Sequence, residues 1–273
     1  MSKNTGINYI TIAGEQINEF YHRGFDFSKY DLRPNEYVIV RQPDGLLLAK
    51  KKVKDNKLLD VPFIKIGTGK GIFKPLNPEQ ECAFDLMTDD SIKIKVLTGL
   101  AGSGKTKIAI KFGMEKLKRE QVSKIFFIRN PVAVGEEVGF FKGDKNAKVL
   151  NWNNPIKDNM DDRMDTLEEL IEKGKVEIDI PATMKGRDIK DAWIIVDEAE
   201  DLTEEQFKMI GERVSAGSYI IFCGDTGQVT KDKYRKNNGL QRAFNLRGIP
   251  LFGCVELLED VRSETSKIFA TMY

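Results

Sequence analysis

The sequence predicts an α/β fold in which a parallel sheet is covered by helices on both faces, preceded by a small β-rich module. From residue 76 onward, apolar segments of strand length alternate with helical patterns. A glycine-rich turn and an acidic segment each follow one of these strands. Residues 1–75 instead carry short strand patterns broken by turns, so we expect two domains, 1–75 and 76–273.

The bulk composition is typical of a soluble globular protein. Of its 273 residues, 41% are hydrophobic and 31% are charged, which argues against disorder. The longest apolar runs, AWIIV and YIIF, have strand length and predict no membrane span. The N-terminus lacks an apolar run behind a basic start, so we expect no secretory signal and a cytoplasmic location. Cys82, Cys223 and Cys254 predict reduced, buried thiols, and the single His22 excludes a multi-histidine metal site.

The first 75 residues predict a small sheet with a basic surface. Two strands are joined by a Gln-Pro-Asp-Gly turn at residues 42–45, and residues 57–67 can add a third. This part carries 13 Lys/Arg against 8 Asp/Glu, a net +5, whereas residues 76–273 carry 30 against 34, a net −4. Much of the basic excess lies at residues 47–57. That stretch either follows phosphates or is a solvated edge strand protected by lysines.

The second part predicts an alternating order of strands and helices. We expect strands at 92–99, 124–130, 175–180, 192–198, 219–225 and 252–258. We expect helices that begin near 77, 105, 204 and 239, and a last one after 262. The carboxyl ends of such parallel strands bind the ligands of this fold class, and the motifs below all follow a strand or begin a helix there.

The segment GLAGSGKT at residues 99–106 matches the phosphate-binding loop of ATPases at every fixed position, after a strand and before a helix. Lys105 is expected to hold the β- and γ-phosphates of ATP, and Thr106 to ligate Mg²⁺. The backbone N–H groups expected to converge on the phosphates belong to Gly99, Leu100, Ala101, Gly102, Ser103 and Gly104. The alternative is a glycine-rich turn that contains Lys-Thr by chance.

The strand WIIV ends in Asp197 and Glu198. Asp197 can hold Mg²⁺, and Glu198 can orient and polarise an attacking water. Acidic residues also begin many helices, and Thr203 with Gln206 forms a capping-box pattern there. That alternative explains the helix start at Thr203 but does not explain a strand that ends in Asp-Glu downstream of a phosphate loop.

Further candidates are open to two interpretations each. Gln228 after the next strand can contact the γ-phosphate, or can be an ordinary loop residue. Gln80 can read an adenine edge, and also fits as the capping partner of Asn77. Arg129 and Arg187 can contact phosphate or nucleic acid, and the residues alone favour a surface role for Arg129.

A long polar segment at residues 143–165 contains a candidate contact for single-stranded nucleic acid. Trp152 can stack on a base while Lys145 and Lys148 neutralise phosphates. Alternatively, Trp152 attaches the segment to the core. Near the C-terminus, Arg262 follows the last strand, so it is expected at the same sheet edge as the phosphate loop and can stabilise charge on the transferring phosphoryl group.

These motifs together resemble the PhoH family of ATPases, whose RecA-like P-loop cores are similar to the first motor domain of superfamily 1 helicases. The resemblance covers about 200 residues, from residue 77 to the end. It is carried by LTGLAGSGKT, RNPVAVGEEVGFFKGD, MKGRDIKDAWIIVDEAEDLTEEQFKMI, IIFCGDTGQV and EDVRSET. RPNEYVIV and GIFKPLNPEQ resemble the β-rich connector of longer family members that carry a PIN nuclease. Residues 1–75 are too short for that nuclease, so its activity is not expected here.

The resemblance implies roles for several residues. Gln80 matches the glutamine that reads adenine, and Gln228 matches the sensor glutamine. Glu136 and Arg187 lie in two further family segments. The chain departs from the family at Glu200, where glutamine is usual, which leaves the coupling role of that position in doubt. Smaller departures are Lys142, where proline is usual, and Val261, where the helicases have a tyrosine that stacks on adenine.

The resemblance also implies partners. The family is described as RNA helicases and is thought to form rings, so we expect a homo-oligomer such as a hexamer. Our first hypothesis is an Mg²⁺-dependent ATPase coupled to single-stranded RNA or DNA. The alternative is an ATP-operated oligomeric switch without helicase activity. Arg262 would reach either the ATP of its own chain or that of a neighbour in the ring.

Overall fold

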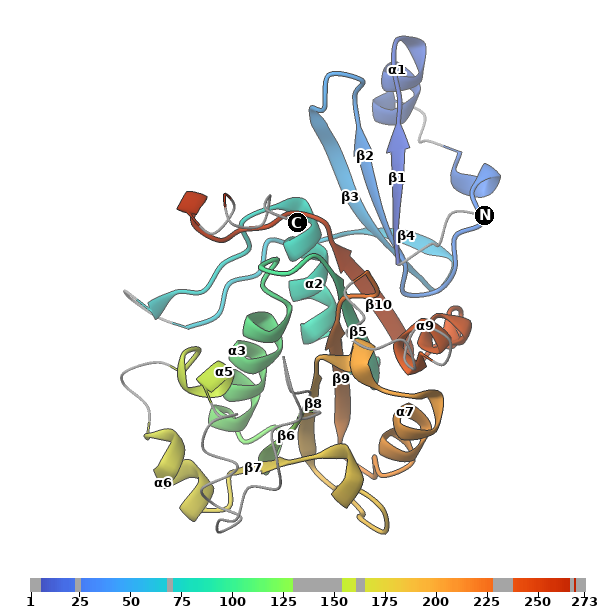
Figure 1. Cartoon of the computed structure of the whole chain (residues 1–273). Helices are drawn as coiled ribbons and strands as arrows, with labels where there is room; N and C mark the ends of the chain where they lie inside the picture. Colours follow the sequence, from blue (N-terminus) through green and yellow to red (C-terminus); the bar gives the residue numbers. More distant parts are fainter. Residues whose placement is uncertain are drawn as a thin grey trace.

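The computed structural model describes residues 6–22, 26–67, 71–129, 154–160, 165–227, 238–265 and 268. Two sheets organise these residues, a four-stranded one near the N-terminus and a six-stranded one in the rest of the chain (Figure 1). Within the described ranges, no helix is both long and apolar enough to cross a bilayer. The domain boundary at residue 75 remains a prediction.

The N-terminal sheet has the strand order β1-β2-β3-β4. Its strands are β1 (Ile7–Thr11), β2 (Tyr37–Arg41), β3 (Leu47–Lys54) and β4 (Lys57–Asp60). β1 runs parallel to β2, and the other pairs are antiparallel. The turn predicted at residues 42–45 joins β2 to β3. Three elements of this part were not predicted: β1, the helix α1 (Glu15–His22) and the 3-10 helix η1 (Phe27–Lys29).

The larger sheet has the order β10-β5-β9-β8-β6-β7, and all of its strands are parallel. The strands are β5 (Ile94–Gly99), β6 (Lys124–Arg129), β7 (Val176–Asp179), β8 (Ala192–Asp197), β9 (Tyr219–Gly224) and β10 (Phe252–Leu257). All six predicted strands are therefore confirmed. The phosphate-loop strand β5 and the acidic strand β8 lie on either side of β9, so their carboxyl ends face one edge.

Helices cover both faces of this sheet, as predicted (Figure 1). One face packs against α2 (Pro78–Thr88) and α3 (Lys105–Lys118), through a core that includes Phe84, Ile108 and Trp193. The opposite face packs against α7 (Glu204–Gly211) and α9 (Gly239–Ala243). Shorter elements complete the chain: α5 (Asn154–Lys157), α6 (Leu167–Glu172), η3 (Pro181–Thr183), η4 (Ala199–Asp201) and η5 (Phe244–Leu246).

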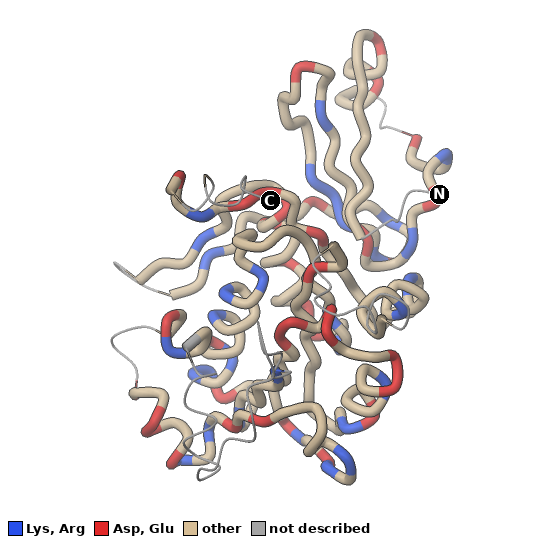
Figure 2. Tube along the Cα trace, in the orientation of Figure 1, with Lys and Arg blue, Asp and Glu red and all other residues tan. Residues whose placement is uncertain are grey.

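Opposite charges join the N-terminal sheet to α2 (Figure 2). Three lysines of β3 pair with carboxylates along this helix and at its C-cap: Lys50 with Glu81, Lys52 with Asp85 (2.9 Å) and Asp89 (2.7 Å), and Lys54 with Asp89 (3.1 Å). Burial opposes ionisation of Asp89, but hydrogen bonds from Lys52 and Ser91 hold its pKa well below the usual range. Of the two alternatives for residues 47–57, the edge strand is wrong, because β3 pairs with both β2 and β4.

Polar contacts fix the same module to the last strand of the larger sheet. The side chain of Asn35 donates to the carbonyl oxygens of Pro250 (2.9 Å) and Phe252 (2.8 Å). Arg247 donates from Nε to Glu36 (2.7 Å). These contacts hold the module against β10 and the residues just before it. The ion pairs of the β3 lysines hold it against α2, the helix that carries Gln80, so the basic stretch at residues 47–57 largely forms ion pairs within the molecule.

We predict that Lys52→Met lowers the free energy of unfolding by roughly 2 kcal/mol, because it leaves two largely buried carboxylates without their shared cation. The side chain of Lys52 is only 6% exposed. Lys51→Met is the control, since Lys51 pairs with Asp60, whose side chain is 84% exposed, and should change stability by less than about 0.5 kcal/mol. Calorimetric unfolding measures both variants, and equal losses would contradict the interpretation.

Candidate functional site

The phosphate-loop segment lies between the end of β5 and the start of α3. Gly99 has φ +122°, and a Cβ at this position would lie 2.0 Å from the carbonyl oxygen of Leu257, so only glycine fits. Lys105 folds back over the loop, where its ammonium group donates to the carbonyl oxygens of Gly99 and Leu100, each at 2.8 Å. The ammonium group of Lys105 is thus held against the loop, where it is predicted to bind phosphate.

The acidic strand end meets the helix start directly. Thr106 Oγ1 donates to Asp197 Oδ1 at 2.7 Å, although the two residues are 91 positions apart. Asp197 is buried, and burial together with the nearby charge of Glu198 raises its pKa to about 6. A hydroxyl and a carboxylate side by side are the oxygen ligands that Mg²⁺ prefers, so these two residues fit the predicted metal site.

Glu198 turns out of the strand and meets Arg129 from the neighbouring strand β6. The backbone of Glu198 is left-handed, with φ +50°, which is unusual for a glutamate. Arg129 Nη2 lies 2.8 Å from Glu198 Oε1, and Arg129 Nη1 lies 3.8 Å from Asp197 Oδ2. The surface role favoured for Arg129 by the residues alone is therefore wrong, because its guanidinium group contacts both acidic candidates.

Glu200 is buried beneath this carboxylate pair. Its Oε2 accepts a hydrogen bond from the backbone N–H of Asp225 (3.1 Å), at the end of β9, and its carbonyl oxygen accepts one from Asn238 Nδ2 (2.9 Å). Burial, followed by a hydrogen bond with Glu198 and its charge, raises the pKa of Glu200 to about 9. This shift favours the protonated carboxyl at neutral pH.

Gln80 reaches the phosphate loop from α2. Its Nε2 donates to the carbonyl oxygen of Ser103 (3.0 Å), and its Oε1 accepts from the backbone N–H of Leu76 (2.9 Å). Asn77 caps the helix through the backbone N–H of Gln80 (2.8 Å), as predicted, but the side chain of Gln80 does not return to Asn77. With these two contacts counted within the described part of the chain, one donor and one lone pair of the amide are left for a further partner.

Arg262 lies against the phosphate loop of its own chain. A Cβ on Gly102, which has φ +78°, would lie 1.9 Å from Arg262 Nε and 2.3 Å from Asp260 Oδ1. Val261 donates its backbone N–H to the carbonyl oxygen of Gly102 (3.2 Å), and Asp260 Oδ1 lies 3.3 Å from Arg262 Nε. The arginine is thus brought to the expected edge of the sheet.

Asp260 and Glu259 were not predicted as residues of this site. Asp260 holds Arg262, and Glu259 accepts from Asn77 Nδ2 at 3.1 Å, so the segment after β10 contacts both α2 and the loop. The only sequence signal is an aspartate two positions before an arginine, which is common on surfaces.

Other candidates lie elsewhere or outside the described residues. Arg187 pairs with Glu177 (2.5 Å) and Asp179 (3.7 Å) of β7, and lies over the ring of Phe126. Arg187, which lies between η3 and β8, is therefore ion-paired to the outer strand β7, and these contacts do not test its predicted nucleic-acid contact. Gln228, Glu136 and Trp152 fall outside the described residues, as do Lys142, Lys145 and Lys148.

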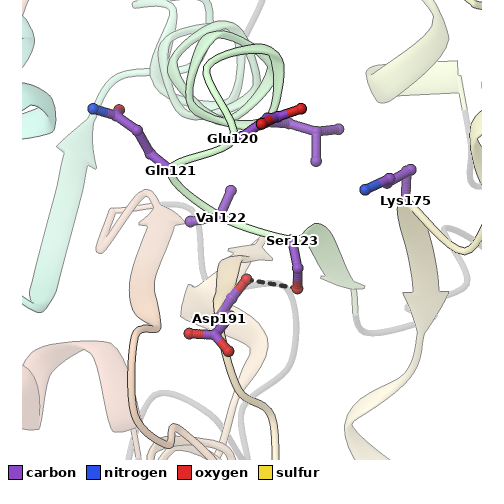
Figure 3. A pocket seen from close by; sticks show the side chains of 7 residues that line it. Glu120, Gln121, Val122, Ser123, Lys175 and Asp191 are labelled. Atoms are coloured by element: carbon purple, nitrogen blue, oxygen red, sulfur yellow. Dashed lines mark hydrogen bonds between the residues drawn. The ribbon is translucent and has the colours of Figure 1, made fainter.

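A hollow of about 370 Å³ lies at the opposite end of the sheet (Figure 3). Ser123, Lys175 and Asp191 line it, and each of them lies just before a strand, at the amino ends of β6, β7 and β8. The carbonyl oxygen of Asp191 accepts from the hydroxyl of Ser123 at 2.9 Å. None of the site candidates above lines this hollow, so it is separate from the phosphate loop.

Comparison with known proteins identifies the family. The family model for PhoH-like proteins matches residues 72–273, the part that builds the larger sheet and the loop. The chain belongs to the PhoH-like family. Its similarity to Protein PhoH2 of Bacillus subtilis is 27% identity over 98% of this chain and 60% of the relative. For Protein PhoH2 of Mycolicibacterium smegmatis, identity is 30% over 98% of this chain and 62% of the relative.

This PhoH-like chain is also 37% identical to a PhoH-like protein of Bacillus subtilis, over 58% of the chain and 50% of the relative. The chain therefore spans about half to three-fifths of the length of these curated relatives. Among solved structures, one of Pif1 helicases at forked double-stranded DNA is 16% identical, with a TM-score of 0.32 over 72% of this chain and 47% of that one. That likeness is too weak to carry an argument.

We predict that Glu200→Gln raises the melting temperature at pH 8 by roughly 4 °C, with little change at pH 5. Below pH 4.5 both states of the wild type keep the proton. Between pH 4.5 and about 9 only the unfolded state loses it, so stability falls as pH rises through this window. A glutamine side chain does not titrate in this range, so the variant lacks this loss of stability. Melting curves across this range measure the effect, with the exposed Glu172→Gln as control, and a difference that does not grow with pH would contradict it.

Proposed function

We propose that this protein hydrolyses ATP with Mg²⁺ and couples hydrolysis to binding of single-stranded RNA or DNA. One observation carries the proposal: the hydrogen bond of 2.7 Å between Thr106 and Asp197 joins the phosphate-loop helix to the acidic strand end. A chance glycine-rich turn would not need a buried aspartate from a strand 91 positions away. Membership in the PhoH-like family supports the same reaction.

The binding roles follow from the residues around the loop. The backbone N–H groups from Gly102 to Lys105 and the start of α3 favour phosphate oxygens. When ATP binds, the ammonium group of Lys105 would leave the carbonyl oxygens of Gly99 and Leu100 and donate to phosphate oxygens. Bound Mg²⁺, held by Thr106 and Asp197, would neutralise charge on the phosphates. Gln80 has the remaining donor and acceptor to bind an adenine edge.

Two side chains would serve the hydrolytic step. Glu198 can orient a water and take up its proton, because it is partly exposed beside the buried Asp197. Arg262 can stabilise negative charge on the phosphoryl group. Its contact with Gly102 of the same chain favours action within its own subunit. Coupling to nucleic acid rests on the resemblance to the helicase-like family.

We predict that single-stranded RNA or DNA raises the ATPase rate of the wild type. Lys105→Ala should abolish hydrolysis by weakening ATP binding, whereas Glu198→Gln should keep binding and lower kcat by roughly 100-fold or more. ATPase assays at low salt, with equilibrium ATP binding, measure these effects. No stimulation by either nucleic acid would contradict the coupling. An ATP-dependent change in mass by light scattering without stimulation would favour the switch alternative.

We predict that Arg262→Ala lowers kcat by roughly 100-fold while changing ATP affinity far less, because the guanidinium acts mainly on the developing charge. Mixing Arg262→Ala with Lys105→Ala separates the two placements of the arginine. If Arg262 serves its own subunit, the mixture stays inactive. Restored activity in the mixture would contradict this placement, because it requires an arginine that acts across a subunit boundary.

A further inference from the structure

Within the described site, Arg129 of β6 is the cation from another strand that contacts Glu198, the predicted water-activating residue. Strands β6 and β8 are parallel neighbours, and Arg129 is in register with Asp197. Its guanidinium nevertheless reaches one residue further, to Glu198 Oε1 at 2.8 Å, and stays 3.8 Å from Asp197 Oδ2. The closer contact is therefore with the residue that would activate water.

The contact of Glu198 with Arg129 competes with a water for the carboxylate. Arg129 Nη2 contacts Oε1 of Glu198 from the side of β6. A water-activating glutamate must accept a hydrogen bond from that water, and a salt bridge competes for the same lone pairs. The site as described thus holds Glu198 in ion-paired form.

The ion pair is suited to be exchanged. The side chains of Arg129 and Glu198 are 30% and 44% exposed, so water screens the pair and its net contribution is small. A guanidinium group binds phosphate oxygens through two parallel hydrogen bonds, which compete well with a single contact to a carboxylate. A phosphate that reaches the edge of the sheet can therefore remove Arg129 from Glu198.

We propose that Arg129 is a positioning residue that restrains Glu198 in the resting protein and releases it when a phosphate group takes the guanidinium. The phosphate belongs either to a nucleic-acid strand or to the nucleotide itself. This inference rests on the proposed ATPase function and adds a control on it: hydrolysis stays slow until the ligand arrives.

The test compares ATP hydrolysis by the full chain in four proteins, each with and without single-stranded oligouridine or oligothymidine. They are the wild type, Arg129→Met, Arg129→Lys and the control Arg119→Met. Methionine keeps much of the length of arginine without charge or donors, and lysine restores the cation. Arg119 pairs with Glu115 at the far end of α3, so its loss removes an ion pair away from the site.

If Arg129 restrains Glu198, Arg129→Met should raise kcat/KM for ATP about five-fold when no oligonucleotide is present. Under the same condition, Arg129→Lys and Arg119→Met should stay near the wild type. If strand phosphate is the trigger, kcat itself rises in Arg129→Met and stimulation by the strand disappears. If nucleotide phosphate is the trigger, KM falls while kcat and stimulation are unchanged. A kcat/KM at or below the wild-type value overturns the proposal, because Arg129 would then support Glu198 in its working position.

Two further comparisons distinguish a failure of this inference from a failure of the proposed function. The rise in kcat/KM that Arg129→Met causes should be absent when Glu198→Gln is also present, because the arginine acts through Glu198, and an equal rise in both backgrounds overturns the proposal. If the wild type hydrolyses no more ATP than Lys105→Ala, the proposed function fails for the wild type. Activity that appears only in Arg129→Met would then support restraint, and an inactive Arg129→Met would overturn both.

Discussion

The hydrogen bond between Thr106 and Asp197 is the contact on which the rest of the site depends. It joins the first turn of α3 to the end of β8, across the intervening strand β9. Because Asp197 is buried and its pKa is raised to about 6, it needs a polar partner, and the hydroxyl of Thr106 provides one. With these two residues fixed, Lys105 and Glu198, the residues next to them, are brought to the same edge of the sheet.

Around this contact, the charged and amide groups expected to meet ATP already have protein partners. Lys105 bonds to loop carbonyl oxygens, Arg262 to Asp260, and Arg129 to Glu198. A bound ligand would therefore replace these existing contacts of the three side chains. The N-terminal module contributes indirectly, because its lysines hold α2, the helix that brings Gln80 to Ser103. This arrangement connects the β-rich module to the end of the larger sheet that carries the phosphate loop.

Sequence alone predicted the six core strands, because each is a short apolar run bounded by polar turns. It also predicted the loop and the acidic pair, because these motifs are contiguous. It could not predict the partner of Arg129, which depends on β6 lying beside β8 and not on any local pattern. The pairing of β3 lysines with α2 was missed for the same reason. The weak β1 pattern, INYIT, gave no signal that it would run parallel to a strand 30 residues later.

We propose that one chain binds ATP between its phosphate loop and its acidic strand end, with Arg262 from the same chain. A crystal structure of Glu198→Gln with ATP and Mg²⁺ would reveal this binding mode. We expect Lys105 to leave the carbonyl oxygens of Gly99 and Leu100 for the phosphates, and Arg262 of the same chain to reach the terminal phosphate. A nucleotide bound away from the loop, or one contacted by Arg262 of a neighbouring chain, would rule this binding mode out.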